Sequence, residues 1–445
     1  MSLLGSRSFR HGVHPEEHKD QTAHLVVERM RFVPRYELLL SQHGGKPSRS
    51  IVKPGQRVVR GQMIAEADGF VSTSLHSPVT GTVGKLEMCR HPNGRLVPMI
   101  EIESDPYSPQ TWSDPITTDP ASLNNDEFVQ FIQSKGIVGM GGAAFPAHVK
   151  YKVPEGKKLE KLILNGCECE PYLTCDHRVM VEWAKAVVRG AAILADALDV
   201  PEIHVGIEKN KPDAVEAMKA AAKDDPRFRI VALTVKYPQG AEKMLIKALL
   251  DVEVPAGKLP FEVGALVNNI GTMAAIADAF DLGRPLVERV VTVAGPGVER
   301  PANLLVPIGT PVREVFAACG GLGSETREVI MGGPMMGQPM IALEAPVLKG
   351  TSGLLAFSES QAGITAEYTC LKCGRCVESC PAFLNPSKLA RLAKTKRYPE
   401  MEESYVMDCM ECGSCSYACP SNIPIVQLIR VAKSSLRDAQ RKEKK

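Results

Sequence analysis

The sequence has no long hydrophobic run. None of its 445 residues belong to a stretch approaching about 18 apolar residues, so we expect no transmembrane helix. The first residues, MSLLGSRSFRHGVHPEEHKDQ, lack the apolar centre of a secretory signal, so we expect the chain to stay in the cytosol. Charges of both signs nearly cancel, and a net charge of +2 argues against nucleic-acid binding and strong electrostatic membrane binding.

Residues 29–110 lack a residue that their pattern would otherwise demand. VKPGQRVVRGQMIAEADG and HSPVTGTVGKLE combine short apolar pairs with glycine and proline turns, which predicts short strands. This pattern resembles the barrel-sandwich hybrid of biotinyl and lipoyl carrier domains, which present a modified lysine at a hairpin tip. No lysine lies between Lys53 and Lys85, and this absence excludes a carrier role. We therefore expect a structural or docking module.

Residues 120–284 alternate between two kinds of pattern. KLILNG, EIHVGIE, FRIVALTV and GALVNN look like buried strands, whereas RVMVEWAKAVVRGAAILADALD and AVEAMKAAAKD look like helices. Strands that alternate with helices predict an α/β domain with a parallel sheet flanked by helices.

The remaining regions are shorter. Residues 1–28 form a polar arm whose four histidines could bind metal, but their irregular spacing favours a solvated arm packed on a neighbour. Residues 286–345 read as a small β-grasp module with one helix, and we expect linkers on both sides of the α/β and β-grasp pair, at 104–122 and up to about 368. Residues 366–432 hold most cysteines, and residues 433–445 read as a charged tail. We expect an amphipathic helix that begins near Ile425 and a frayed end at RKEKK.

Disulfides are not expected for the thirteen cysteines, because the cytosol keeps thiols reduced. Eight of them form two repeats, CLKCGRCVESCP and CMECGSCSYACP, with C-x2-C-x2-C-x3-C-P spacing. This is the ferredoxin pattern for two [4Fe–4S] clusters, in which the fourth cysteine of each run reaches the other cluster. The predicted ligand sets are Cys370, Cys373, Cys376 and Cys419 for one cluster and Cys409, Cys412, Cys415 and Cys380 for the other.

Structural zinc is the alternative for these cysteines. Zinc sites use pairs of C-x2-C, whereas this chain repeats a quartet that ends in Cys-Pro, which favours iron–sulfur clusters. Between the runs, NPSKLARLAKTK predicts a helix with Asn385 as its N-cap, so we expect helices around the clusters.

A glycine-rich loop opens the α/β domain. In GIVGMGGAAFPAHVKY the absent side chains would let the backbone approach a phosphate or a flat ring, although tight turns use the same residues. Lys150 follows eight residues after Gly142, where it could pair with an anion or remain a solvated surface lysine.

Four motifs together make a specific resemblance. GMGGAAFPAHVKY is similar to the flavin loop of the NADH-oxidising, FMN-bearing subunit of respiratory complex I, whose pattern is Gly-Arg-Gly-Gly-Ala-Gly-Phe-Pro. NGCECEPYLTCDHR, YPQGAEKMLIKALL and LVNNIGTMAAIADA are similar to that family's Asn-Ala-Asp-Glu-x-Glu-Pro, Tyr-x-x-Gly-Glu-Glu and Val-Asn-Asn-x-x-Thr segments, in the same order. With the opening HGVHPEEHK, the hybrid region and both cysteine runs, the whole chain resembles the RnfC family, the peripheral NADH-facing subunits of Rnf ion-translocating electron transport complexes.

The resemblance implies a flavin and nucleotide site. The glycines would line FMN, Lys150 would lie near its phosphate or ribityl chain, the acidic stretch would lie at the flavin and nicotinamide edge, and the Val-Asn-Asn-x-x-Thr segment would contact the phosphate end. The residues carried over are Gly139, Gly141, Gly142, Lys150, Asn165, Glu168, Glu170, Tyr237, Gly240, Glu242, Val267, Asn268, Asn269 and Thr272.

The sequence departs from the complex I pattern at four positions. Met140 replaces the loop arginine, Cys167 the first acidic residue, Ala241 the first glutamate of Gly-Glu-Glu, and Tyr172 the glycine after Glu-Pro. No aromatic pair can be assigned to stacking on adenine. These departures bear on the recognition of NADH more than on FMN.

The resemblance also implies a route and a location. Hydride would pass from NADH to FMN, and single electrons would continue through the two clusters to membrane partners and to ferredoxin or flavodoxin, with no general acid or base. The chain would lie at the cytoplasmic face of the cell inner membrane as a peripheral subunit. The direction of flow and the coupling ion stay open, as does the choice of NADH over NADPH.

Two other functions remain open at this point. One is a soluble FMN and iron–sulfur cobalamin reductase of the propanediol microcompartment type, although the N-terminal position of the hybrid region favours RnfC. The other is an electron-transfer scaffold without flavin, against which the intact 267–272 segment and both quartets argue.

Three further cysteines lie within the acidic stretch. Cys167, Cys169 and Cys175 have C-x-C-x5-C spacing, which matches no zinc or iron–sulfur pattern, so a third metal site is the weaker alternative. Cys89 and Cys319 stand alone, and we expect buried structural thiols there.

Overall fold

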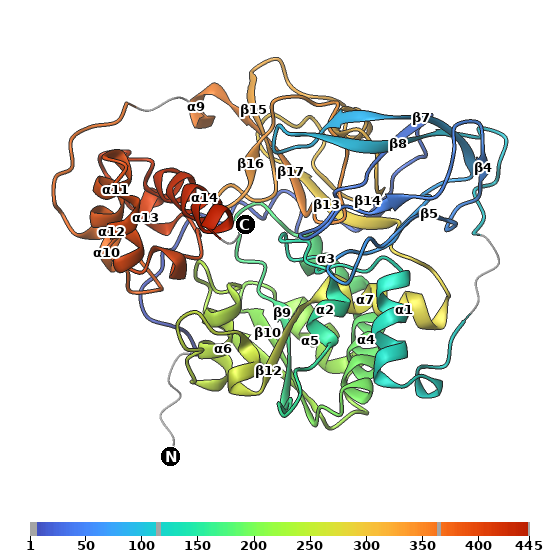
Figure 1. Ribbon diagram of the computed structural model, residues 1–445, viewed down its shortest axis with the longest axis horizontal. Helices are drawn as coiled ribbons and strands as arrows, with labels where there is room; N and C mark the ends of the chain where they lie inside the picture. Colours follow the sequence, from blue (N-terminus) through green and yellow to red (C-terminus); the bar gives the residue numbers. More distant parts are fainter. Residues whose placement is uncertain (1–6, 113–116, 363–365, 444–445) are drawn as a thin grey trace.

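The computed structural model describes residues 7–112, 117–362 and 366–443. Parts of the expected arm, linkers and tail, at 1–6, 113–116, 363–365 and 444–445, lie outside the described residues. Figure 1 shows the hybrid region in blue, the α/β domain mainly in green, the β-grasp sheet in yellow and orange, and the cysteine-rich region in red.

The hybrid region consists of two small antiparallel sheets. One has the strand order β2-β8-β7-β4 and the other β3-β5-β6. Tyr36, Leu38, Ile64, Ile100 and Ile102 are fully buried, which confirms a core between short strands. The strands are β2 (Arg35–Leu39), β3 (Arg49–Ser50), β4 (Arg57–Val58), β5 (Met63–Glu66), β6 (Leu75–His76), β7 (Gly81–Arg90) and β8 (Leu96–Ser104).

The α/β domain is built on a four-stranded parallel sheet, as the sequence predicts. Its order is β11-β10-β9-β12. Alternate side chains of β9 pack in different clusters, with Leu162 and Leu164 on one face and Ile163 on the other. Both faces are therefore covered, as parallel sheets require. The strands are β9 (Lys161–Gly166), β10 (Glu202–Glu208), β11 (Phe228–Leu233) and β12 (Ala265–Asn269).

Helices cover this sheet on both faces (Figure 1). The long helix expected at 178–199 is two helices, because the chain turns at Trp183 between α3 and α4. At Gly190 of α4 a β-carbon would lie 1.8 Å from the carbonyl oxygen of Met273 in α7, so only glycine allows this packing. The helices are η1 (Pro120–Ser122), α1 (Asn125–Ser134), α2 (Ala147–Tyr151), α3 (Cys175–Glu182), α4 (Ala184–Ala197), α5 (Pro212–Ala221), α6 (Glu242–Leu250), η2 (Pro260–Val263) and α7 (Ile270–Asp281).

The β-grasp region contributes to a six-stranded sheet of order β1-β14-β13-β17-β15-β16. The expected linker up to residue 368 is wrong at β17, which pairs with both β13 and β15 inside the sheet. Its run GLLAFS is nearly fully buried and is therefore a central strand. The elements are β1 (Val27–Arg29), β13 (Glu288–Ala294), β14 (Ala302–Pro307), α8 (Val312–Ala318), β15 (Thr326–Met331), β16 (Gln338–Pro339), β17 (Gly353–Ser358) and α9 (Glu359–Ala362).

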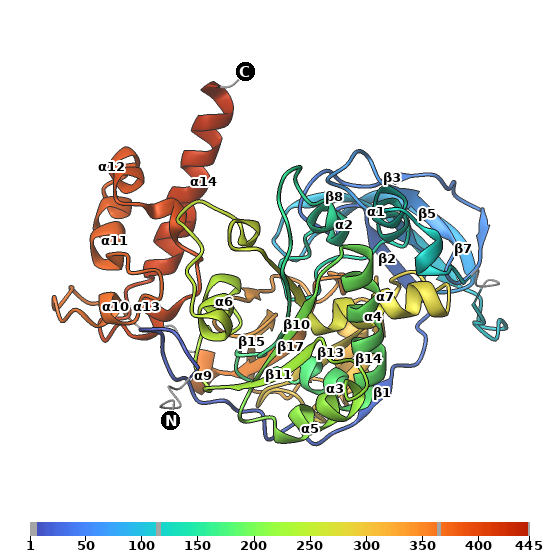
Figure 2. The same cartoon turned by 90° about the horizontal axis from the view of Figure 1, so that it is seen from below.

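The cysteine-rich region repeats one local structure twice. Gly374 and Gly413 take φ of +80° and +83° before the short helices α10 and α13. Asn385 caps α11 by accepting the Lys388 N–H at 3.0 Å, as predicted. The amphipathic helix expected near Ile425 is confirmed as α14, which projects from the body in Figure 2. It continues to Glu443, so residues 441–443 of the end that was expected to fray are helical. The helices are α10 (Arg375–Glu378), α11 (Pro386–Lys394), α12 (Tyr398–Glu403), η3 (Val406–Asp408), α13 (Ser414–Tyr417) and α14 (Ile425–Glu443).

The N-terminal arm packs on three other regions, and Figure 2 shows it running along one side of the molecule toward β1. Gly12 N–H donates to the Ser379 carbonyl at 3.2 Å in the cysteine-rich region. Val13 pairs with Tyr237 of the α/β domain, and β1 extends the six-stranded sheet beside β14. The arm therefore links the parts of the chain, as expected for a segment packed on its neighbours.

Candidate functional site

The carboxyl edge of the parallel sheet brings two predicted residues together. Asn165 is the next-to-last residue of β9 and lies directly opposite Asn269 of β12. From β9 the chain builds β10 and β11 on one side and then returns to place β12 on the other. In open α/β sheets, ligands bind in a crevice at the carboxyl ends of the strands where the strand order reverses, so this edge is the candidate site and is called the crevice below.

The glycine loop lies over this edge. Thr272 of α7 accepts the Met140 N–H at 3.0 Å and donates to the Val138 carbonyl at 3.2 Å, which fixes the loop to the helix. A β-carbon at Gly141 would lie 3.7 Å from Asn269. Gly142 has φ of +99°, and nothing lies within 4 Å of where its β-carbon would be. The loop therefore presents bare backbone beside the start of α7.

Lys150 of α2 lies beside β12. Its Nζ donates to the Val267 carbonyl at 3.2 Å and to Glu242 Oε1 at 3.4 Å. The next residue, Asn268, accepts the Tyr151 hydroxyl at 2.9 Å, while its buried Nδ2 has no hydrogen-bond partner among the described residues. A free amide donor and an ammonium group thus lie near the same strand end, as an anionic or polar ligand requires.

Glu168 acts on a helix rather than on the crevice directly. Its two carboxylate oxygens accept the Asp176 and His177 N–H groups at 2.7 and 3.2 Å at the start of α3. Asn269 Nδ2 donates to Asp176 at 2.6 Å and so continues the network. Burial, and then the Glu168 charge, raise the pKa of Asp176 to about 7.

Asn165 joins two of the predicted motifs. Its Nδ2 donates to the Gly240 carbonyl at 2.8 Å, and the Gly240 N–H donates to Cys169 Sγ at 3.3 Å. A β-carbon at Gly240 would lie 3.3 Å from Asn165, so glycine permits this close approach.

The three cysteines of the acidic stretch have separate surroundings. Cys167 is buried and donates weakly to the Gly206 carbonyl at 3.7 Å, whereas Cys169 accepts from Gly240. In the described ranges no three His, Cys, Asp or Glu side chains are set to hold a single metal ion.

Glu170 and Tyr237 point to other regions of the molecule. The Glu170 carboxylate accepts the N–H groups of Met335 and Met336, both at 2.9 Å, from the loop between β15 and β16. The Tyr237 hydroxyl donates to the Cys412 carbonyl at 2.6 Å. Glu170 and Tyr237 therefore form a junction group, which contacts other regions, and the other predicted flavin-site residues form a crevice group at the edge of the sheet.

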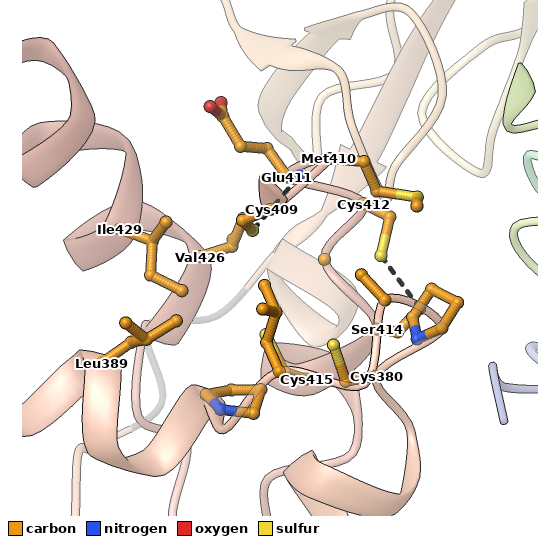
Figure 3. A pocket seen from close by; sticks show the side chains of 15 residues that line it. Cys380, Leu389, Cys409, Met410, Glu411, Cys412, Ser414, Cys415, Val426 and Ile429 are labelled. Atoms are coloured by element: carbon orange, nitrogen blue, oxygen red, sulfur yellow. Dashed lines mark hydrogen bonds between the residues drawn. The ribbon is translucent and has the colours of Figure 1, made fainter. Parts of the chain in front are cut away.

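One cysteine set surrounds a cavity at this junction. Cys380, Cys409, Cys412 and Cys415 line a space of about 380 Å³, part of it open to solvent, together with apolar side chains of α11 and α14 (Figure 3). Burial, and then the neighbouring thiols Cys409, Cys412 and Cys380, raise the pKa of Cys415 to about 12. The chain thus brings the fourth cysteine of the first run to three of the second, and the donor set suits a cluster rather than one ion.

The other quartet lies nearer to solvent. Cys370 and Cys373 are exposed, and Cys376 and Cys419 are half-buried. Burial raises the pKa of Cys376, and the charges of Cys419, Cys370 and Cys373 act in the same direction. Here too the fourth cysteine of the opposite run is a close neighbour.

Two charged residues near the crevice were not predicted. Arg289 is buried on β13, donates to the Lys349 carbonyl at 2.7 Å and lies close to the Met140 carbonyl. An arginine within the otherwise apolar run ERVVTVAG was the sequence signal that could have identified it. Lys19 of the arm donates to the carbonyls of Glu168 and Glu170 at 2.9 and 2.8 Å and also to that of Leu173. A lysine in a polar arm carries no comparable signal.

Four domain families match this chain along its length. They are the RnfC barrel sandwich hybrid domain at residues 7–107, the Nuo51 FMN-binding domain at 132–278, the SLBB domain at 290–339 and the 4Fe-4S dicluster domain at 364–420. They confirm the predicted order of hybrid, flavin-type α/β, β-grasp and two-cluster regions.

Whole-chain relatives agree. The C subunit of the proton-translocating ferredoxin:NAD(+) oxidoreductase complex of Clostridium ljungdahlii is 43% identical over 399 residues, which cover 90% of this chain and 87% of the relative. The C subunit of the Na(+)-translocating complex of Acetobacterium woodii is 39% identical, with 90% of each chain covered. The corresponding member of the ion-translocating oxidoreductase complex of Rhodobacter capsulatus is 41% identical, covering 87% of this chain and 75% of the relative.

None of the described helices is both long enough and apolar enough to span a bilayer. The prediction of no transmembrane helix therefore holds for the described residues. Identity above 30% over most of both chains, together with the four domains in order, confirms the predicted family. The chain belongs to the RnfC family, the C subunits of the Rnf complexes, which are ion-translocating ferredoxin:NAD(+) oxidoreductases.

Proposed function

We propose that this chain exchanges electrons between NADH and two iron–sulfur clusters through FMN bound at the carboxyl edge of the parallel sheet. The observation that carries the proposal is the convergence of the glycine loop, Asn165 and Asn269 at the strand reversal, beside a junction with Cys412. Bound FMN would supply the conversion between hydride and single-electron chemistry.

The crevice residues fit a flavin phosphate and its chain. Gly139, Gly141 and Gly142 provide backbone that a ligand can approach, and the start of α7 offers partial positive charge. Asn268 has a free buried amide donor, and Lys150 lies near Val267 and Glu242. Thr272 holds the loop in place and so preorganises the crevice.

Residues beside the glycine loop would orient ligands at the flavin edge. Asn165 and Gly240 stay in contact there, and Glu168 fixes the start of α3 beside Asn269. No side chain needs to move a proton as a general acid or base, so we assign no catalytic residue. A nucleotide contact of Tyr237 rests on the resemblance alone, and we propose none for Glu170, because both of its carboxylate oxygens accept backbone N–H groups.

The two cysteine sets would hold one [4Fe–4S] cluster each. Cys380, Cys409, Cys412 and Cys415 would bind the cluster nearer to the flavin domain, because Tyr237 contacts Cys412. Cys370, Cys373, Cys376 and Cys419 would bind the outer cluster, whose two exposed thiols favour electron exit toward a partner.

The partners follow from family membership. We propose that the chain docks peripherally on membrane subunits of an Rnf complex, at the cytoplasmic face of the inner membrane, and exchanges electrons with ferredoxin or flavodoxin through them. One relative is named as proton-translocating and another as Na(+)-translocating, so membership in the family assigns no coupling ion.

Anaerobic purification of the full chain tests the proposal. We expect flavin, about eight irons per chain for two clusters, and bleaching of the cluster absorbance on addition of NADH. Iron without flavin would support a scaffold. Flavin and iron that NADH does not reduce would place nucleotide oxidation elsewhere. Release from membranes at high salt would support peripheral attachment.

A further inference from the structure

We propose that Glu170 is a positioning residue that holds the loop of residues 332–337, and through it the Cys412 segment, against the flavin-binding domain. The inference rests on the proposed function and deepens it. Its role differs from the nucleotide contact that the resemblance to complex I implies for this position.

The first contact is between Glu170 and the loop. Both carboxylate oxygens are used, one by the Met335 N–H and one by the Met336 N–H, at 2.9 Å each. A β-carbon at Gly333 would lie 2.3 Å from Glu170 Oε2, so glycine is needed for the loop to approach. Charge-assisted hydrogen bonds to two successive amides fix the direction of the backbone as well as its distance.

The second contact is between the loop and the cluster segment. A β-carbon at Gly413 would lie 2.7 Å from the Met335 carbonyl oxygen, so the two backbones touch. Met335 also packs in one apolar cluster with Cys412, Tyr237 and Val13. The loop therefore lies directly against a predicted cluster ligand.

A third contact supports the same segment from α14. Arg430 Nη2 lies 3.4 Å from the Glu411 carbonyl and 3.5 Å from the Met336 carbonyl. Its Nε pairs with Glu411 at 3.4 Å, and Lys433 donates to Glu411 at 2.8 Å. The loop thus joins the carboxylate on one side to the cluster-bearing segment on the other.

The base of this arrangement is fixed from the opposite side. The buried Lys19 ammonium donates to the carbonyls of Glu168, Glu170 and Leu173, so it holds the backbone on which the Glu170 carboxylate stands. Two direct hydrogen bonds also join the α/β domain to the cluster segment, from the Tyr237 hydroxyl to the Cys412 carbonyl and from the Gly257 N–H to Asp408 at 3.2 Å. Loss of Glu170 would remove the support that the segment receives through the 332–337 loop, and groups that exchange electrons need fixed geometry.

The two possible roles of Glu170 predict different defects. A nucleotide ligand contributes to binding, so its loss raises KM for NADH in any assay. A positioning residue leaves NADH oxidation by the flavin nearly intact and slows transfer from flavin to cluster. Ferricyanide reduction by NADH reports the first step, and stopped-flow bleaching of the clusters reports both steps.

The experiment compares the full holoprotein with E170A, E170Q and the control E216Q. Glu216 is exposed on α5, away from the junction. For E170A we expect KM and kcat with ferricyanide within two-fold of the parent and cluster bleaching at least ten-fold slower. E170Q should fall between, because its amide oxygen can still accept one of the two N–H groups. E216Q should match the parent.

Hydrogen exchange provides a readout that needs no NADH. The Met335 and Met336 amides should exchange at least ten-fold faster in E170A, with a smaller increase in residues 409–413. A parent chain that NADH does not reduce would defeat the proposed function but leave this test valid. A ten-fold rise in KM with unchanged amide exchange would overturn the inference in favour of a nucleotide ligand. If E170A does not fold, unchanged bleaching and exchange in E170Q would overturn it equally.

Discussion

The flavin-binding domain and the cysteine-rich region are held together by different means. The former packs α4 and α7 against one face of a buried sheet and α6 against the other, so a buried apolar cluster covers each face. The latter has a much smaller core around Leu389, Met401 and Ile429, next to half-exposed cysteines. Small domains bury too little apolar surface to be stable alone. The difference implies that one region depends on packing and the other on its metal.

Iron removal tests this difference with the largest expected effect. Stripping the clusters anaerobically should unfold residues 366–443, because the binding free energy of a structural metal centre is also folding free energy. Residues 161–269 should keep their protection, since their core contains no cluster ligand. Hydrogen exchange by segment measures both, and equal loss of protection in the two regions would contradict the comparison.

Gly190→Ala should instead destabilise the flavin-binding domain and leave the cysteine-rich region folded. The new methyl group would meet the Met273 carbonyl at 1.8 Å and force α4 away from α7. We expect the free energy of unfolding of the flavin-binding domain to fall by roughly 3 kcal/mol, the cost of severe overpacking. Denaturant titration followed by flavin release measures it, and the cluster absorbance should be retained until higher denaturant. Ala191→Gly, one residue along the same helix, provides a comparison without overpacking.

Glu170 gives the junction a pH dependence. Burial raises its pKa to about 7 from the usual 4.5, although the two amide donors oppose the shift. The folded state therefore binds the Glu170 proton more tightly than the unfolded state does. The resulting contribution to the free energy of unfolding is complete below about pH 4.5 and is lost as the pH rises to about 7. The parent should lose up to roughly 3 kcal/mol relative to E170Q between pH 4.5 and 7. Denaturation of both proteins at pH 5.5 and 8 tests the sign, and a constant difference would contradict it.

Asn385→Ala should have the smallest effect and act on the cysteine-rich region alone. Loss of the cap to the Lys388 N–H should cost about 1 kcal/mol in α11. With clusters bound, the change should be visible only as faster hydrogen exchange at the start of α11. An equal increase of hydrogen exchange in the flavin-binding domain would show that the two regions unfold together.

The two regions also differ in what their sequences reveal. The two cluster ligand sets could be predicted from the sequence, because their spacing involves neighbouring residues only. The Cys-Pro at the end of each run indicates that its fourth cysteine binds the cluster of the other run. The direct pairing of Asn165 with Asn269 was not predicted, because the resemblance assigned the two residues to different ends of the flavin. The contact from Glu170 to Met335 and Met336 could not be predicted, since backbone amides of any residue serve equally and 165 residues separate the partners. The strand β17 was missed for a related reason: a short apolar run after a module reads equally as linker or strand.

The arm contact from Gly12 to Ser379 also sets an order of assembly. The two residues are 367 positions apart, as are His11 and Glu378, which also bond. At about 5–20 residues per second of synthesis, the arm waits roughly 20–70 s for its partner to be made. Tyr237 and the crevice residues are made within that interval, before the arm's partners Glu378 and Ser379 exist. The crevice can therefore accept flavin before the arm is fastened, whereas both clusters must wait for Cys409 to Cys419, which are made after the arm's partners.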